Sequence, residues 1–263
     1  MLAALPCIAL SEEKAKDEKP AGKDAPEAKP ALDADTADAL IKDLASEKPD
    51  APAKAVDQLA RAGEQAIPYL LKQKKNKNET IRRKIAAILG RIMTKDSLDA
   101  LYEMLADKSE AVRREAICSV GNHQKPESLE KLQDFLLHKS SAIRLETVMA
   151  LGRIGHASSL PALKRSCLDD DQMVRQGAVV ALGLVKDKGA IPDVISRLRD
   201  DDKTVRTLAY VVLKRLSGTD LGFDPADDEP KRNESILLWE TWWKANEKSG
   251  TGGSTGQEQK KKE

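Results

Sequence analysis

Apolar residues recur along the middle of the chain in a pattern that repeats every 31 residues. The clearest copies read IRRKIAAILG, VRREAICSVG, IRLETVMALG, VRQGAVVALG and VRTLAYVVLK. Within each copy the apolar positions fall at i, i+4, i+5 and i+8, which line one face of an α-helix. Each copy therefore predicts a helix that buries one side, and the constant spacing predicts identical connections between copies.

A second helix is predicted in front of each of these. Its leading apolar column, at the same spacing, is Ile67, Leu98, Leu129, Leu160 and Ile191. The turn between the two helices ends in a residue whose side-chain oxygen can cap the following helix. These residues are Asn78, Ser109, Ser140, Asp171 and Asp202. The repeating unit is therefore helix, short turn, helix.

A single helix pair of this kind cannot bury its apolar face alone, so successive pairs must stack. Residues 36–63 form a degenerate copy ahead of the regular ones. Together they predict an all-α fold, a right-handed α-solenoid of about six two-helix repeats, over residues 33–218.

The end of the solenoid is expected to be covered by residues 219–248, an acidic connector followed by a last helix. That helix is predicted over residues 235–247, where Trp239, Trp242 and Trp243 fall at i, i+3 and i+4 on one side. We interpret the tryptophans as a cap on the last repeat, because the core of a terminal repeat needs a cover. An exposed platform for a partner is the alternative.

The two ends of the chain differ from the repeats in composition. Residues 1–10 read MLAALPCIAL, which resembles the end of a secretory signal peptide without its basic region. Export to the periplasm or cell envelope is therefore expected, with a cytoplasmic location as the alternative; Pro6 makes lipidation of Cys7 a poor fit. Residues 11–32 and 249–263 are rich in charged or small residues and are predicted to be a disordered linker and a tail.

The sharpest polar feature is an arginine after the first apolar residue of every regular copy. This arginine ladder comprises Arg82, Arg113, Arg144, Arg175 and Arg206. A cation in the first turn of a helix is mildly unfavourable with the helix dipole, so we expect compensating acids from the turns. The candidates are Asp107, Asp169, Asp170, Asp200 and Asp201. We interpret the ladder as structural arginine–aspartate pairs that tie repeats together; an anion-binding stripe is the alternative.

The run D-x-x-VR-x-x-A-x-x-x-LG resembles the short HEAT-like repeats of the phycobilisome-lyase type. The copies DDDQMVRQGAVVALGLV and DDDKTVRTLAYVVLKRL match it closely, and the resemblance covers about residues 36–217. It implies a helical solenoid that serves mostly as an interaction scaffold. It also leaves a bilin lyase, which attaches a chromophore, as the alternative function.

Composition and charge narrow the choice of partner. The 44 Lys and Arg residues nearly balance 43 Asp and Glu, so no global field draws the protein to nucleic acid or to an anionic membrane. Basic residues gather between residues 71 and 99 without interleaved aromatic side chains for base stacking, which makes nucleic-acid binding an unfavoured prediction. No apolar stretch is long enough to span a membrane.

No residues at catalytic or metal-binding spacing emerge. The three cysteines and three histidines are scattered, and no phosphate-binding loop or nucleophile motif occurs. We therefore predict a non-catalytic monomer without a cofactor or metal, which binds a protein partner on the concave surface formed by the second helices. The candidate partner-binding residues are Arg83, Arg91, Arg114, Met149 and Arg153.

Overall fold

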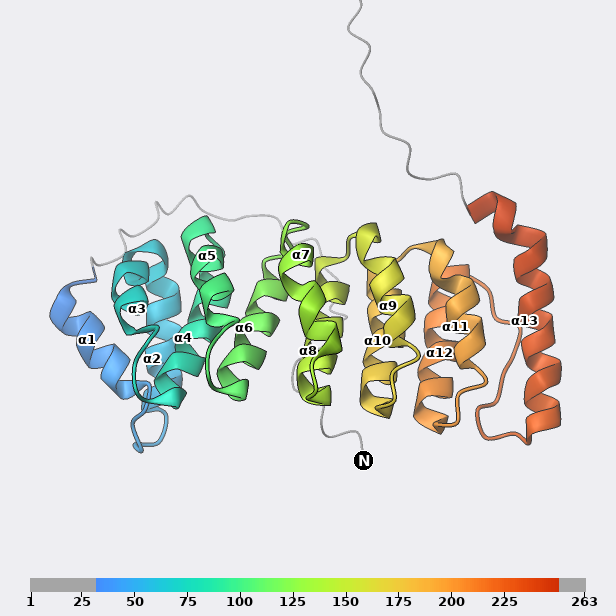
Figure 1. Ribbon diagram of the computed structural model, residues 1–263, viewed down its shortest axis with the longest axis horizontal. Helices are drawn as coiled ribbons and strands as arrows, with labels where there is room; N and C mark the ends of the chain where they lie inside the picture. The colour runs from blue at the N-terminus through green and yellow to red at the C-terminus, as the bar shows by residue number, and fades with distance from the viewer. Residues whose placement is uncertain (1–31, 251–263) are drawn as a thin grey trace, which may run out of the picture. The chain divides into compact units, whose positions relative to one another are not determined.

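The computed structural model describes residues 32–250, and the side chains as far as Glu247. Within that range the chain is helical, with no strand, and the helices follow one another in sequence order (Figure 1). The segments predicted for residues 1–10 and 11–32, apart from Leu32, lie outside the described residues. So does almost all of the tail predicted for residues 249–263.

The helices form six pairs and one terminal helix. The first helices of the pairs are α1 (Ala34–Asp43), α3 (Ile67–Gln73), α5 (Lys95–Met104), α7 (Ser128–Leu132), α9 (Leu160–Ser166) and α11 (Ile191–Arg197). The second helices are α2 (Ala51–Ala62), α4 (Glu79–Ile92), α6 (Glu110–Asn122), α8 (Ser141–Ile154), α10 (Gln172–Val185) and α12 (Lys203–Ser217). The terminal helix is α13 (Glu229–Gly250). The predicted all-α solenoid of two-helix repeats is confirmed.

Short 3₁₀ helices adjoin several first helices. They are η1 (Gly63–Ala66), η2 (Gln133–Leu137), η3 (Ala157–Ser159) and η4 (Lys188–Ala190). Three of them precede a first helix, whereas η2 continues α7, which is itself only five residues long. The repeat that contains α7 is therefore the least regular of the described set.

The predicted capping residues occupy the N-cap position in all five regular repeats. In four of them the side chain accepts a backbone N–H from the first turn, namely in Asn78, Ser109, Asp171 and Asp202. Ser140 is the exception, because its hydroxyl donates to Glu110 at 2.7 Å and makes no cap hydrogen bond. The capping column thus sets where each second helix begins, with one irregular member.

Consecutive second helices approach each other closely, and a column of glycines permits this. A Cβ atom placed on Gly152 would lie 2.7 Å from the Cβ of Ala181 and 2.8 Å from its Cα, which is closer than real side chains come. Gly121 faces Ala150 of α8 in the same way. The position that corresponds to these glycines in α12 is Lys214. Between residues 32 and 250 no second helix follows α12, so no close approach is needed there.

The core is continuous through the stacked pairs and is built from aliphatic columns. One predicted column consists of Leu89, Val120, Leu151, Leu182 and Leu213, and each of these is at most 1% exposed. The structural equivalent of Ala86 in the last repeat is Tyr210, which is only partly buried and contacts the terminal helix. The apolar columns therefore bury as the sequence predicted, apart from Tyr210 and from Leu160 of the leading column, which is partly buried.

The terminal helix begins earlier than predicted, at Glu229. The Asp228 carboxylate accepts the backbone N–H of Lys231 at 3.1 Å, and Pro230 suits the first turn of a helix. Trp239 is 0% exposed and packs edge-on against Tyr210, with 6.5 Å between ring centroids. Helix α13 covers α11 most extensively, so it lies over the end of the last pair (Figure 1).

This packing predicts unequal effects for two large side chains of α13. Replacing the buried Trp239 with alanine should lower the free energy of unfolding by about 3 kcal/mol or more, because it leaves a cavity against the last repeat. Replacing Leu237, which is 60% exposed on the same helix, should change it little. Thermal melts followed by circular dichroism measure both, and equal melting temperatures for the two variants would contradict the capping role.

Candidate functional site

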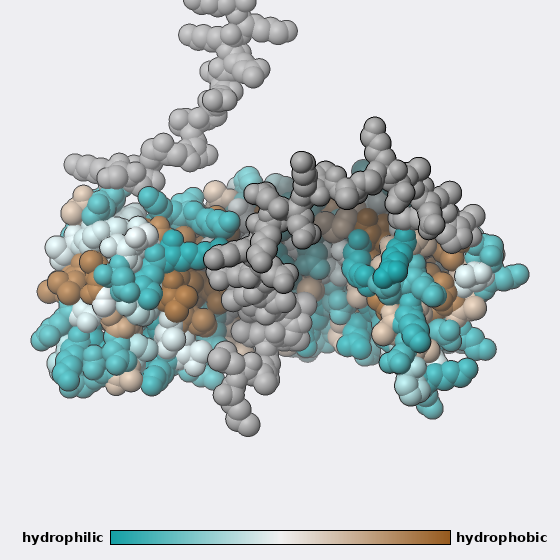
Figure 2. Space-filling view, turned by 180° about the vertical axis from the view of Figure 1, so that it is seen from behind, coloured by the Kyte–Doolittle hydropathy of each residue, from teal (hydrophilic) through white to brown (hydrophobic). Residues whose placement is uncertain are grey.

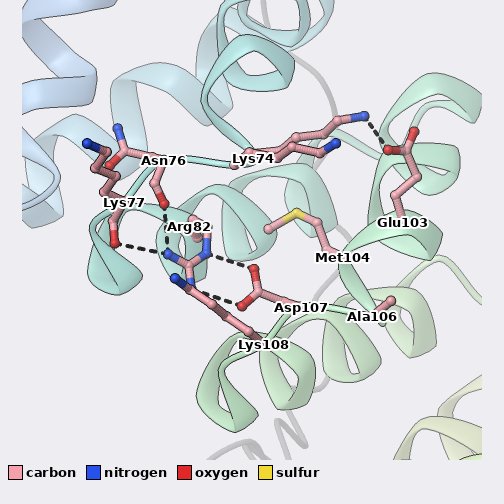
Figure 3. Close-up of a pocket in the computed structure, with 10 residues that line it drawn as sticks. Lys74, Asn76, Lys77, Arg82, Glu103, Met104, Ala106, Asp107 and Lys108 are labelled. Atoms are coloured by element: carbon pink, nitrogen blue, oxygen red, sulfur yellow. Dashed lines mark hydrogen bonds and ion pairs between the residues drawn. The ribbon is translucent and has the colours of Figure 1, made fainter.

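Three arginines of the ladder join their repeat to the next through a two-pronged contact. The Nε and Nη2 atoms of Arg82 donate to the two carboxylate oxygens of Asp107 at 2.7 and 2.9 Å (Figure 3). The Nη1 atom donates to the backbone carbonyl oxygens of Asn76 and Lys77 at 2.7 and 3.3 Å. Because Asp107 lies in the turn of the following repeat, one guanidinium fixes both its own turn and its neighbour's.

Two further rungs repeat this geometry. Arg144 pairs with Asp169 at 2.8 and 2.7 Å, and Arg175 pairs with Asp200 at 2.9 and 3.0 Å. The predicted partners Asp170 and Asp201 make no such pair and offer only their backbone carbonyls, to Arg175 and to Arg206. The acids therefore come from the next repeat, 25 residues ahead, and the arginine's own turn supplies carbonyl oxygens.

The remaining two rungs lack a carboxylate. Arg206 donates through Nε and Nη2 to the carbonyl oxygen of Pro225 at 3.2 and 2.8 Å, so the connector replaces a missing next repeat. Arg113 keeps its bonds to the carbonyls of Asp107 and Lys108, but the residue 25 positions ahead is His138. Within residues 32–247, the Nε and Nη2 atoms of Arg113 have no hydrogen-bond or ion-pair partner. An alignment of the 31-residue copies would have revealed from the sequence that His138 stands where the neighbouring copies have Asp107 and Asp169.

A pocket of about 370 Å³ lies beside the Arg82 rung, between two neighbouring turns (Figure 3). Its charged lining consists of Lys74, Lys75, Lys77, Arg82, Glu103, Asp107 and Lys108. Lys74 forms an ion pair with Glu103, and the Arg82 guanidinium is already bound to Asp107. The remaining cations that line the pocket are lysine ammonium groups. They would attract an anion, but flexible lysine side chains do not hold it in a fixed orientation.

The candidate partner-binding residues lie on the outward side of the second helices. We call this surface the second-helix face, meaning the positions of α4, α6, α8, α10 and α12 that correspond to Arg83, Ala87 and Arg91. Arg83 and Arg91 are exposed, and Arg114 and Arg153 are partly buried. Met149 corresponds to Ala87 and was expected at the surface, but its side chain is only 8% exposed. The close approach of successive second helices buries it.

Five charged side chains gather on and beside the part of this face formed by α4, α6 and α8. Burial raises the pKa of Glu115. The negative charge of Glu146 raises the pKa of Glu115 further, whereas the positive charges of Arg83, Arg114 and Arg153 oppose the rise. Arg153 donates through Nη2 to Glu146 at 3.1 Å. Three arginines thus face two carboxylates in a partly buried cluster.

Two of these arginines carry unsatisfied donors. The Nε atoms of Arg114 and Arg153 are buried and have no hydrogen-bond partner among the described residues. Arg114 has no ion pair in that part of the chain either. A buried N–H without an acceptor costs roughly 1–3 kcal/mol, so such donors call for an explanation.

Further along, the same face mixes apolar and polar side chains. The apolar ones are Leu145, Val180 and Leu184, which are partly buried, and Val211, which is 53% exposed; the polar ones are Gln176, Thr207 and Arg215. Elsewhere hydrophilic residues cover much of the visible surface, with smaller hydrophobic patches between them (Figure 2). The second-helix face is therefore rich in charge towards α4 and carries more apolar side chains from α8 onwards.

The described part of the chain holds a thiol with a strongly shifted pKa. Burial raises the pKa of the Cys167 thiol to about 12, which leaves it unreactive at neutral pH. No group of three His, Cys, Asp or Glu residues that could hold a metal occurs between residues 32 and 247. No described helix is long and apolar enough to cross a membrane.

The stacked helix pairs, the glycine column and the ladder define an α-solenoid of short repeats. A family model for HEAT repeats matches residues 37–119, 102–183 and 165–225, and this chain belongs to the HEAT-repeat family. No curated protein sequence matches it.

Two solved structures of similar fold are informative. YibA of Escherichia coli is 26% identical over 69% of this chain and 72% of its own, with a TM-score of 0.56. The complex of CpcE and CpcF of phycocyanin lyase from Nostoc sp. PCC7120 is 25% identical over 57% of this chain and 99% of that one, with a TM-score of 0.52.

The ladder geometry predicts unequal costs for two substitutions. The side chains of Arg144 and Asp169 are 17% and 13% exposed, so Arg144→Ala should cost between the ~1 kcal/mol of an exposed pair and the ~3–5 kcal/mol of a buried one. Arg113→Ala removes no carboxylate pair and should cost less. Chemical denaturation of both variants measures the difference, and a larger loss for Arg113→Ala would refute the pairing as the source of stability.

The paired aspartates also predict a pH dependence. Burial by itself raises the pKa of Asp107 and Asp169, but the hydrogen bonds from Arg82 and Arg144 outweigh it, so each pKa lies below its ordinary value. Their stabilisation should be complete above the unfolded-state pKa of ~3.9 and should be lost as the pH falls through the lower folded-state pKa. Melting temperatures measured from about pH 6 down to about pH 2 should fall at the acid end. The fall should be shallower in Arg144→Ala; identical profiles would argue against this coupling.

Proposed function

We propose that this protein is a non-catalytic scaffold that binds another protein on its second-helix face. The observation that carries the proposal is the group of arginines on this face: Arg83 and Arg91 are exposed, and Arg114 and Arg153 are partly buried. Arg114 makes no ion pair with another described residue, so its guanidinium charge can attract a carboxylate from another molecule. Guanidinium groups bind carboxylates and backbone carbonyls well, and both are abundant in protein segments.

The change of character along the face supports a protein ligand in particular. Arg83 and Arg91 extend the charged part at α4, whereas Val211 leaves an exposed apolar side chain at α12. A ligand that crosses the face would meet positive charge at α4, and apolar side chains together with Arg215 towards α12. Protein segments combine both kinds of side chain along one chain, and interfaces draw much of their energy from a few such contacts.

A non-catalytic role agrees with the absence of an assembled site in the described residues. Two aspartates of the connector form hydrogen bonds with nearby backbone N–H groups. Asp220 accepts the N–H of Gly222 at 3.0 Å, and Asp224 accepts that of Ala226 at 2.8 Å. The buried Cys167 thiol lacks the low pKa of a nucleophile. What remains on the surface is suited to recognition by shape and charge.

The test is a comparison of two double variants in affinity purification from the native source. Arg114→Ala with Arg153→Ala removes both unsatisfied donors, whereas Lys131→Ala with Arg165→Ala removes two exposed charges from the first helices and is the matched control. The first should weaken binding of a stoichiometric protein partner about tenfold or more, as expected for interface hot spots. The control should bind normally.

Circular dichroism should show that both double variants remain folded. If the arginine variant binds the partner as strongly as the control does, the second-helix face is not the binding surface. If the wild-type protein retains no protein in stoichiometric amount, the scaffold role itself is refuted.

A bilin lyase is the second candidate, favoured by the similarity to the CpcE and CpcF complex. Bilins carry carboxylate groups, which the arginines of the second-helix face could bind. Adding a bilin to the purified protein should then shift its visible absorbance, and the Arg114 and Arg153 substitutions should abolish the shift. An unchanged spectrum would count against this candidate.

A further inference from the structure

The repeat formed by α7, η2 and α8 departs from the pattern at several points that lie together. Its first helix is cut short and continues as η2. Its capping residue, Ser140, turns its hydroxyl to Glu110. The turn just before Ser140 carries His138 in the column where the neighbouring repeats carry Asp107 and Asp169. Local exceptions to an otherwise regular pattern often mark places that serve a function.

Arg113 faces this irregular turn with one edge of its guanidinium unused. Its Nη1 atom donates to the carbonyls of Asp107 and Lys108 at 2.8 and 3.2 Å, the same anchoring bonds that Arg82 and Arg144 make to their own turns. The His138 ring is occupied by its own turn, since Nδ1 accepts the N–H of Ser140 at 3.0 Å. The Nε and Nη2 atoms of Arg113 remain without a partner in residues 32–247.

The other rungs indicate which chemical group suits that edge. In Arg82, Arg144 and Arg175 it binds both oxygens of one carboxylate, at 2.7–3.0 Å. Anchoring through Nη1 orients the guanidinium in advance, so a carboxylate from outside would meet a donor pair already in position. Lys108 and Lys139, both on the neighbouring turns, add positive charge.

An apolar residue accompanies the open rung. Leu137 directly precedes His138 and is 89% exposed. Leu168, at the corresponding position of the next repeat, is 68% exposed. Surface turns are usually lined by polar side chains, so two exposed leucines at corresponding positions of adjacent turns are unusual. They can contact an apolar side chain of a partner.

We propose that the Arg113 rung and Leu137 form a docking site for a protein segment that carries a carboxylate beside an apolar side chain. The carboxylate completes the ladder at its one open position, and the apolar side chain packs on Leu137. This site lies along the turns, apart from the second-helix face, so it is a second contact surface whose failure leaves the proposed function standing.

The test uses a short labelled peptide that alternates glutamate and leucine, with a peptide that alternates glutamine and leucine as the matched ligand. Fluorescence anisotropy at low salt should show binding of the first and about tenfold weaker binding of the second, as expected for a charge-assisted hydrogen-bonded pair. Arg113→Ala should weaken binding of the glutamate peptide by a similar factor. Arg175→Ala, at a filled rung whose anchoring bonds go to Asp169 and Asp170, should leave it unchanged wherever the protein remains folded.

The decisive variants are His138→Asp and His138→Asn, which have the same shape and differ in charge. His138→Asp supplies the missing carboxylate from the protein itself, so it should raise the melting temperature and abolish binding of the glutamate peptide. His138→Asn should do neither. The proposal is overturned if the wild-type protein does not bind the peptide, if His138→Asp still binds it, or if a single-stranded oligonucleotide binds at Arg113 in preference to the peptide.

Discussion

The close contact between successive second helices is the constraint on which the rest of this structure depends. Gly121 and Gly152 each face an alanine backbone at a distance that excludes a Cβ atom, so the glycine column sets how near one repeat lies to the next. That separation also places each turn within reach of the arginine of the preceding repeat. The two-pronged pairing of Arg144 with Asp169 is then a consequence of the stacking, and the anchoring of Nη1 to the arginine's own turn makes it rigid.

Breaks in the repeat pattern have different physical causes. Lys214 replaces a glycine where no second helix of the described residues comes close to it, and Pro225 replaces an aspartate because the connector follows α12 there. These two exceptions belong to the end of the stack. His138 lies in the middle, where both neighbours are present, and no such cause applies to it. This contrast is what makes the Arg113 rung a candidate for an outside ligand.

The two proposed surfaces use arginine in different settings. On the second-helix face the guanidinium groups lie in a partly buried cluster with Glu115 and Glu146, where burial makes each unmet donor costly. At the Arg113 rung the guanidinium lies at the edge formed by the turns and is held by two backbone carbonyls. A protein that contacts both surfaces would wrap from the face to the edge of the stack.

The sequence by itself determined the helix pairs, the columns that bury and the N-caps, because these follow from local spacing and from hydrogen bonds within a turn. It also pointed to arginine–aspartate compensation but not to the correct partners. Only the stacking shows that Asp107, Asp169 and Asp200 pair with the arginine of the preceding repeat and that Asp170 and Asp201 do not. The burial of Met149, the unmet donors of Arg114 and the open rung at Arg113 were likewise decided by tertiary structure. Each depends on how closely neighbouring repeats approach, and that distance results from packing between helices far apart in sequence.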